Sequence, residues 1–160
     1  MYNTSSKILE RTVLGQKLAQ WRLKDDQIVF TNGCFDLLHL GHVDYLEKAS
    51  QLGTRMVVGL NSDVSVRNIK GEGRPIQNQE SRARLIAALE FVDAVVLFDE
   101  DNPLDLITFV EPEILVKGDD YTVQEIVGHE IVKEKGGKIE TIPLVEGHST
   151  SRLIDSIKNG

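Results

Sequence analysis

The chain has 160 residues, of which 41% are hydrophobic, and this supplies enough apolar material for the core of one domain. Its net charge of −7 excludes the broad basic surface on which non-specific nucleic-acid binding depends. Cys34 is the only cysteine and no apolar run is long enough to span a bilayer, which excludes an internal disulfide and a membrane-spanning helix. We therefore expect a cytoplasmic protein that binds neither nucleic acid nor membranes.

An amphipathic leading helix is predicted from about Ser6 to Leu23, where Leu14, Leu18 and Trp21 recur at helical spacing. A polar turn, Lys24-Asp25-Asp26, separates this helix from the first apolar run. We interpret residues 1–26 as an N-terminal helical extension and residues 27–160 as a single domain.

The next stretch combines a strand, a glycine turn and a helix. Ile28-Val29-Phe30 is typical of a buried strand, Thr31-Asn32-Gly33 interrupts it, and an amphipathic helix begins after Gly41. His39 and His42 lie one helical turn apart, where free backbone N–H groups and the helix dipole favour an anion. Gly41 leaves room for a phosphate to approach the backbone. A core histidine and a helix-capping histidine are the alternative interpretation.

A second buried strand is predicted over residues 55–61, and Asp63 follows its carboxyl end, where open α/β sheets bind ligands. Asp63 could equally be the N-cap of the following helix. Residues 67–78 are expected to form a loop with three cations, Arg67, Lys70 and Arg74, which could close on a polyphosphate. A solvated surface loop is the alternative.

Helices and strands alternate over the rest of the chain. A helix capped by Asn78 is expected to reach Glu90, with Arg82 in its first two turns, where a cation opposes the dipole unless an anion lies nearby. Further strands are predicted over 93–98, 114–118 and 138–143, with helices over about 102–110 and 123–135 and a last helix ending near Lys158. This rhythm predicts an α/β fold with a Rossmann-like, doubly wound parallel sheet of five strands, helices on both faces and an N-terminal helix. No GxGxxG fingerprint is present, which argues against a hydride-transfer enzyme.

The pattern Thr31-x-Gly33-x-Phe35-Asp36-x-x-His39-x-Gly41-His42 resembles the signature of the cytidylyltransferase-like nucleotidyltransferases, which carry HxGH after their first strand. Other motifs are similar to one branch of that family: Asn61-Ser62-Asp63, Lys70-Gly71, Arg74-Pro75, Arg82, Val116-Lys117-Gly118-x-Asp120-Tyr121 and Gly147-x-Ser149-Thr150. This branch adenylates D-glycero-β-D-manno-heptose 1-phosphate and makes the ADP-heptose of bacterial surface glycans such as lipopolysaccharide. The resemblance implies ATP and a sugar phosphate as substrates, Mg²⁺ bridging phosphate oxygens, and a homodimer or higher homo-oligomer.

Two alternative functions stay open. A CTP-dependent cytidylyltransferase acting on glycerol 3-phosphate or a similar phosphorylated alcohol shares the HxGH motif, but its last loop begins with an arginine-threonine pair where this chain has Leu144-Val145. A non-catalytic nucleotide-binding regulatory module would not need paired histidines together with Lys70 and Arg82. The chain also departs from the heptose branch at His148 and Asp119, where that branch often has cysteine and glycine.

The resemblance and the chemistry of phosphoryl transfer together suggest roles for individual residues. His39 and His42 would donate to the phosphate oxygens on which charge builds, while Lys70 and Arg82 would hold the triphosphate or the acceptor phosphate. The nucleotide-binding set comprises both histidines with Thr31, Asn32, Gly33, Cys34, Phe35, Gly41, Gly118, Asp120, Ser149, Thr150 and Ser151. Asp36, Asp63 and Lys70 are expected on the acceptor side, and no side chain is assigned to a metal.

Overall fold

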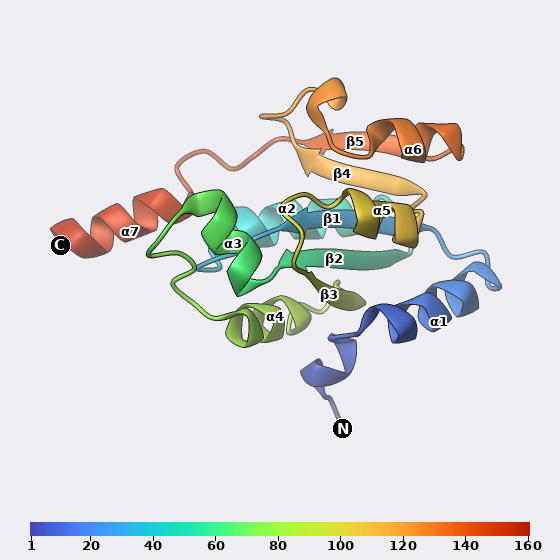
Figure 1. Cartoon of the computed structure of the whole chain (residues 1–160), viewed down its shortest axis with the longest axis horizontal. Coiled ribbons are helices and arrows are strands. Elements are labelled where there is room, and N and C mark those ends of the chain that lie inside the picture. The colour runs from blue at the N-terminus through green and yellow to red at the C-terminus, as the bar shows by residue number, and fades with distance from the viewer.

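A computed structural model describes all 160 residues, which build one five-stranded parallel sheet with helices packed on both of its faces (Figure 1). The strands are β1 (Ile28–Gly33), β2 (Arg55–Asn61), β3 (Ala94–Phe98), β4 (Ile114–Gly118) and β5 (Lys138–Ile142). Their spatial order is β3-β2-β1-β4-β5, and every neighbouring pair is parallel. The predicted doubly wound, Rossmann-like sheet is confirmed.

The helices are η1 (Thr4–Lys7), α1 (Arg11–Arg22), α2 (Leu40–Ser50), α3 (Asp63–Lys70), α4 (Gln79–Ala87), α5 (Leu104–Val110), η2 (Val123–Glu125), α6 (His129–Glu134) and α7 (Thr150–Asn159). Two hydrophobic clusters show which helices cover each face of the sheet. Leu46 of α2 and Ile86 of α4 belong to one cluster, whereas Leu14 of α1, Leu106 of α5 and Val132 of α6 belong to the other. None of these helices has the length and apolar character that a membrane span needs.

The N-terminal segment packs against the body of the protein. Leu14, Leu18 and Trp21 are buried as predicted, although α1 begins later than expected. Before it, Ile8 forms a parallel bridge with Val95 of the edge strand β3, and the Leu9 N–H donates to the Val95 carbonyl at 2.9 Å. The segment therefore covers the edge of β3, which would otherwise expose unpaired backbone groups.

Two predicted elements are wrong in their extent because of glycine conformations. Helix α3 continues to Lys70, and Gly71 at φ 88° ends it, so Arg67 lies on a helix and the loop is shorter than expected. The single helix expected over 123–135 is divided into η2 and α6, because Gly128 adopts φ 86° between them.

Helix α4 follows the predicted cap but is shorter than expected. The Asn78 side chain accepts a hydrogen bond from the Ser81 N–H, as an N-cap does, and the helix ends at Ala87. Ile86 is buried as predicted, whereas Leu85 is 39% exposed, so the prediction that Leu85 faces inward is wrong.

Strands β1 and β4 separate toward their carboxyl ends. β1 pairs with β2 along its whole length, but it pairs with β4 only at Val29–Ile114 and Phe30–Leu115. The strand order also reverses at this point, because β2 and β3 are added on one side of β1 whereas β4 and β5 are added on the other. Open α/β sheets bind their ligands at such a reversal, outside the carboxyl ends of the strands.

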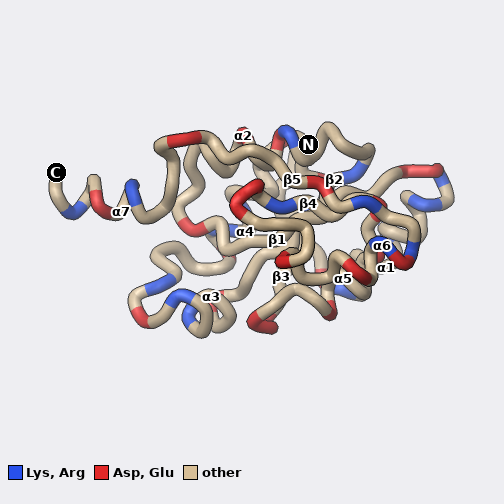
Figure 2. Tube along the Cα trace, turned by 90° about the horizontal axis from the view of Figure 1, so that it is seen from above, with Lys and Arg blue, Asp and Glu red and all other residues tan.

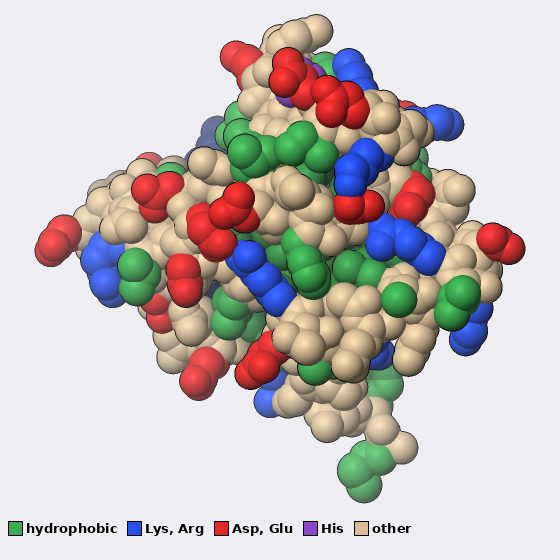
Figure 3. All heavy atoms as spheres, turned by 45° about the vertical axis from the view of Figure 1, so that its right-hand side comes forward, with side chains coloured by type: hydrophobic (Ala, Val, Ile, Leu, Met, Phe, Trp, Pro, Cys, Tyr) green, Lys and Arg blue, Asp and Glu red, His purple; other side chains and the backbone are tan.

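Charged side chains of both signs are interspersed over the molecule. Figure 2 shows Lys and Arg alternating with Asp and Glu along helices and loops, and Figure 3 shows the same mixture on one face, with apolar side chains between them. The whole-surface field of a chain with net charge −7 does not attract phosphates. Affinity for a phosphate must therefore come from donors gathered inside a cleft.

Candidate active site

A cavity of about 650 Å³ opens where β1 and β4 separate. Its walls come from the segment after β1, the first turn of α2, the end of β4, the α3–α4 loop and residues 144–151. The predicted residues that line it are Asn32, Gly33, Cys34, Phe35, Asp36, His39, Gly41, His42, Lys70, Gly118, Asp120, Ser149, Thr150 and Ser151. The remaining three predicted residues, Thr31, Asp63 and Arg82, lie outside it.

The two histidines form a stacked pair at the start of α2. Their ring centroids are 3.7 Å apart and their planes are inclined by 21°, while Phe35 contacts His42 edge-on at 5.2 Å. Phe35 and Leu37 hold positive φ angles of 46° and 58°, a strain that typically occurs at functional sites. The Nδ1 atoms of His39 and His42 are buried without a hydrogen-bond partner. An unpaired buried polar atom is costly, and both rings line the cavity, so a bound oxyanion would lie against the pair.

The histidines are neutral at pH 7. Burial lowers the pKa of His42 to about 4, and the neighbouring His39 lowers it further than Asp36 raises it. Burial and the nearby His148 lower the pKa of His39 as well. Each neutral imidazole still carries one N–H, so the pair can donate to phosphate oxygens without a full positive charge.

Two glycines allow side chains of the site to approach the backbone. A Cβ atom at Gly41 would lie 2.9 Å from Cε1 of His39, and one at Gly118 would lie 2.6 Å from Oδ1 of Asp120. The space beside Gly41 therefore admits the His39 ring. The expected approach of a phosphate to this backbone stays a prediction.

Asp36 anchors the loops around the cavity. Its Oδ2 accepts from Nε of Arg74 at 2.9 Å and from the Ile76 N–H at 2.8 Å, and its Oδ1 accepts from the Gln77 N–H at 3.0 Å. Its carbonyl accepts from the Thr150 hydroxyl at 2.9 Å. Burial opposes ionisation of Asp36, but these N–H donors outweigh it and lower the pKa. Both carboxylate oxygens hold the loop, which makes Asp36 a positioning residue, and its contact with the acceptor stays a prediction.

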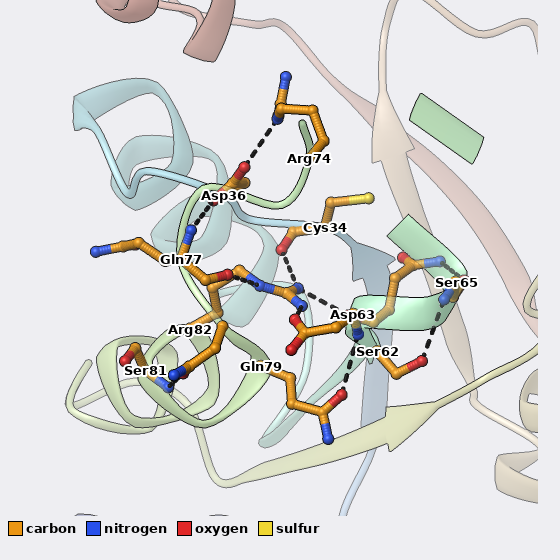
Figure 4. A network of polar contacts seen from close by, with 12 residues as sticks. Cys34, Asp36, Ser62, Asp63, Ser65, Arg74, Gln77, Gln79, Ser81 and Arg82 are labelled. Carbon is orange, nitrogen blue, oxygen red and sulfur yellow. Dashed lines mark hydrogen bonds and ion pairs between the residues drawn. The ribbon is translucent and has the colours of Figure 1, made fainter. Parts of the chain in front are cut away.

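Arg82 is fully buried and ties several segments together (Figure 4). Its Nε donates to the Gln77 carbonyl at 3.0 Å, its Nη1 to the carbonyls of Cys34 and Asn61 at 2.8 and 2.7 Å, and its Nη2 to Asp63 at 2.8 Å. The guanidinium thus joins the ends of β1 and β2 to the loop before α4. The predicted direct contact of Arg82 with a phosphate does not fit this arrangement, because the side chain is fully buried, does not line the cavity and donates to protein groups.

Asp63 neutralises Arg82. Besides this ion pair, its N–H donates to Oε1 of Gln79 at 3.0 Å. The alternative N-cap role for Asp63 is wrong, since Ser62 occupies that position and its hydroxyl accepts from the Ser65 N–H. Asp63 thus pairs with Arg82 and does not line the cavity, and its contact with the acceptor stays a prediction.

Two side chains bridge β1 and β4 beyond the point where their backbone ladder ends. Thr31 is fully buried and its hydroxyl donates to the Val116 carbonyl at 2.9 Å, so it holds the sheet instead of lining the nucleotide site as predicted. Nζ of Lys117 donates to the Asn32 carbonyl at 3.1 Å and lines the cavity. Sequence reasoning assigned Lys117 no role, because its place beside Asn32 depends on the pairing of strands that are distant in the sequence.

The three cations expected in the loop have different positions. Lys70, at the end of α3, lines the cavity and is exposed, whereas Arg67 does not line it. Arg74 also lines the cavity but is paired with Asp36. Asp101, in the segment between β3 and α5, contributes to the same cavity wall.

Helix α7 presents its N-terminus to the cavity. Ser149 is its N-cap and accepts from the Arg152 N–H at 3.2 Å, and Thr150 and Ser151 begin the helix. These three residues line the cavity, as does the apolar pair Leu144-Val145. The free N–H groups of this turn suit a phosphate.

A family model for cytidylyltransferase-like proteins matches residues 30–155. The chain belongs to the cytidylyltransferase-like family. The bifunctional protein HldE of Trichlorobacter lovleyi is 51% identical over 155 residues, or 97% of this chain and 32% of that protein. The HldE protein of Citrifermentans bemidjiense is 52% identical with the same coverage. The chain thus spans about a third of the length of these curated relatives.

Two solved structures have folds similar to this one. The lipopolysaccharide core biosynthesis protein from Thermoplasma volcanium has 30% identity and a TM-score of 0.63, covering 77% of this chain and 99% of that chain. Pantoate-beta-alanine ligase from Francisella tularensis has a TM-score of 0.62 at 13% identity, covering 94% of this chain and 76% of that one, and shows a shared fold alone. The predicted family is confirmed.

Proposed function

We propose that this protein is an adenylyltransferase that transfers AMP from ATP to D-glycero-β-D-manno-heptose 1-phosphate and releases pyrophosphate. The stacked pair of His39 and His42, whose rings line the cavity and whose buried Nδ1 atoms have no hydrogen-bond partner, is the observation that carries the reaction type. The motifs shared with the heptose branch support the acceptor. The similarity to a protein named for lipopolysaccharide core biosynthesis supports it too.

The reaction forms a bond between an acceptor phosphate oxygen and the α-phosphorus of ATP, and it breaks the bond to the departing pyrophosphate. Charge grows on the phosphate oxygens, so catalysis depends on position and on electrostatic stabilisation. His39 and His42 donate to these oxygens, and the first turn of α7 at Ser149 and Thr150 holds the phosphate chain. The acceptor phosphate is already ionised, so the reaction needs no general base.

Lys70 supplies an exposed positive charge to the cavity that it lines. It is exposed and forms no ion pair within the chain, so its ammonium is available to the triphosphate. Arg82 and Asp36 act differently, by fixing the strand ends and the loop on which the site is built. This division of roles assigns direct contact to Lys70 and positioning to the other two residues.

The donor set of the cavity fits a metal ion carried by the nucleotide. No group of three or more His, Cys, Asp or Glu side chains is placed to hold a metal ion. Mg²⁺ keeps several waters and commonly binds through substrate phosphates with few protein ligands. We therefore treat the Mg²⁺ complex of ATP as the substrate and place the reaction in the cytoplasm, where ATP is made.

Product analysis tests this function. The protein is incubated with heptose 1-phosphate, Mg²⁺ and each of the four ribonucleoside triphosphates, and pyrophosphate and the nucleotide sugar are measured. We expect pyrophosphate and ADP-heptose in equal amounts with ATP. Absence of pyrophosphate with every triphosphate contradicts a transferase and favours a non-catalytic nucleotide-binding module.

A further inference from the structure

Lys117 occupies the floor of the cavity, between the separated ends of β1 and β4. The backbone ladder of these strands ends at Phe30 and Leu115, so no strand hydrogen bond reaches Lys117 from β1. Its Nζ instead donates to the Asn32 carbonyl at 3.1 Å and lies 5.8 Å from the centre of the Tyr121 ring. The ammonium is thus held in place by two neutral groups.

Lys117 differs from the two arginines of the site in having no counter-charge. Arg74 is paired with Asp36 and Arg82 with Asp63. No carboxylate lies within ion-pair distance of Nζ of Lys117. Lys117 is half-buried, and a cation sheltered from water without a paired anion is costly to maintain. Because Lys117 lines the cavity, an anion bound there lies within reach of it.

We propose that Lys117 binds a phosphate oxyanion of a substrate at the floor of the cavity, with the Asn32 carbonyl holding the ammonium in place until the substrate arrives. This inference rests on the proposed function, in which both substrates carry phosphates. The oxyanion belongs either to ATP or to the acceptor phosphate, and the two are distinguished by measuring each substrate alone.

If the Lys117 ammonium binds a phosphate, substrate affinity depends on the protonation of Lys117, and a purely structural role would not produce this pH dependence. Burial lowers the pKa of Lys117 to about 8, although Cys34 at the end of β1 and Asp120 after β4 act in the opposite direction. Tyr121 contacts the ammonium through its ring, and His42, Tyr45 and Glu125 line the same cavity. Burial raises the pKa of the Cys34 thiol and of the Tyr45 hydroxyl, so neither group begins to ionise near pH 8.

The test compares Lys117→Met, which keeps the length without the charge, with Lys117→Arg, which keeps a charge that does not titrate. Lys133→Met, on exposed α6, is the matched control. Dissociation constants for ATP with Mg²⁺, for heptose 1-phosphate and for inorganic phosphate are measured by calorimetry. We expect Lys117→Met to lower the affinity for one substrate about tenfold or more, which is the loss expected for a hydrogen bond to a charged group. Lys117→Arg and Lys133→Met should retain most of that affinity.

The pH dependence is measured on the same proteins. Wild-type affinity for that substrate falls as the pH rises through about 8, because the ammonium loses its proton, whereas the Lys117→Arg affinity does not. Unchanged affinity for all three ligands in a folded Lys117→Met protein overturns the inference. So does an equal loss in Lys117→Met and Lys117→Arg together with a lowered melting temperature, which marks a structural role. Wild-type protein that binds ATP but forms no product with any triphosphate refutes the proposed function instead, and the ATP and inorganic phosphate measurements still decide the role of Lys117.

Discussion

The neutral state of His39 and His42 follows from their burial against each other and Phe35, and it determines how they act on a phosphate. As N–H donors to oxygens that gain charge in the transition state, they affect turnover more than substrate affinity. Replacing either histidine with alanine should lower kcat about 10²-fold or more, the range for one lost donor of this kind. Steady-state kinetics measures the effect, and near-normal kcat in both folded variants would contradict the assigned role.

Burial of His42 also makes the stability of the protein depend on pH. Its pKa is about 4 in the folded state against an ordinary value of 6.5, so the unfolded state binds more protons between these values. Burial of neutral His42 therefore has no effect on the free energy of unfolding above about pH 6.5, and it lowers that free energy as the pH drops toward 4. Between pH 7 and pH 5 this one group accounts for at most about 2 kcal/mol. Urea unfolding at both pH values should show a smaller loss for His42→Gln than for wild type, and an equal loss would show that His42 is not responsible.

At the scale of elements, Arg82 connects β1, β2 and α4 through four hydrogen bonds. Replacing it with methionine leaves Asp63 and buried carbonyls without partners, and should cost about 3 kcal/mol or more of stability. Thermal and urea unfolding measure this loss. If Arg82→Met instead kept its melting temperature and lost only affinity for ATP, Arg82 would be a phosphate contact after all.

The loop between α3 and α4 is held at one end and open at the other. Asp36 fixes Arg74, Ile76 and Gln77, whereas Gly71 and Gly73 have no neighbouring atoms where a side chain would lie. Trypsin should therefore cleave after Lys70 in the empty protein. ATP with Mg²⁺ should protect this bond once Lys70 contacts the triphosphate. Unchanged cleavage at a saturating concentration of ATP would refute the closing of this loop on the nucleotide.

The sequence predicts the strands well because their apolar runs are continuous, and the residues 114–118 are found as β4 without change. It also predicts the cap at Asn78, and most of the predicted site residues do line the cavity, because they follow one another in local motifs. The sequence does not predict side-chain contacts between residues that are distant along the chain. Arg82 has the same local pattern whether it faces a ligand or the carbonyls of β1 and β2, and only the folded chain distinguishes these two cases.

At the scale of the whole molecule, the chain corresponds to about a third of its bifunctional relatives. The residues that line its cavity come from the carboxyl ends of strands, from the loops that follow them and from helices. Two predictions about the whole molecule have no test in this structure: the division into an extension at 1–26 and a domain at 27–160, and a homodimer or higher homo-oligomer. Light scattering on the purified protein measures the oligomeric state, and a mass of one chain, 17.9 kDa, would contradict that prediction.

The choice of nucleotide tests the central claim most directly. Leu144 and Val145 line the cavity with apolar surface, where the cytidylyltransferase branch has an arginine-threonine pair. An apolar wall suits the larger adenine face, and a site that lacks the partners of cytosine leaves that base without its hydrogen bonds. With the same heptose 1-phosphate, we expect kcat/KM for ATP to exceed that for CTP by about 10²-fold or more. A value for CTP equal to or above that for ATP would contradict the adenylyltransferase assignment.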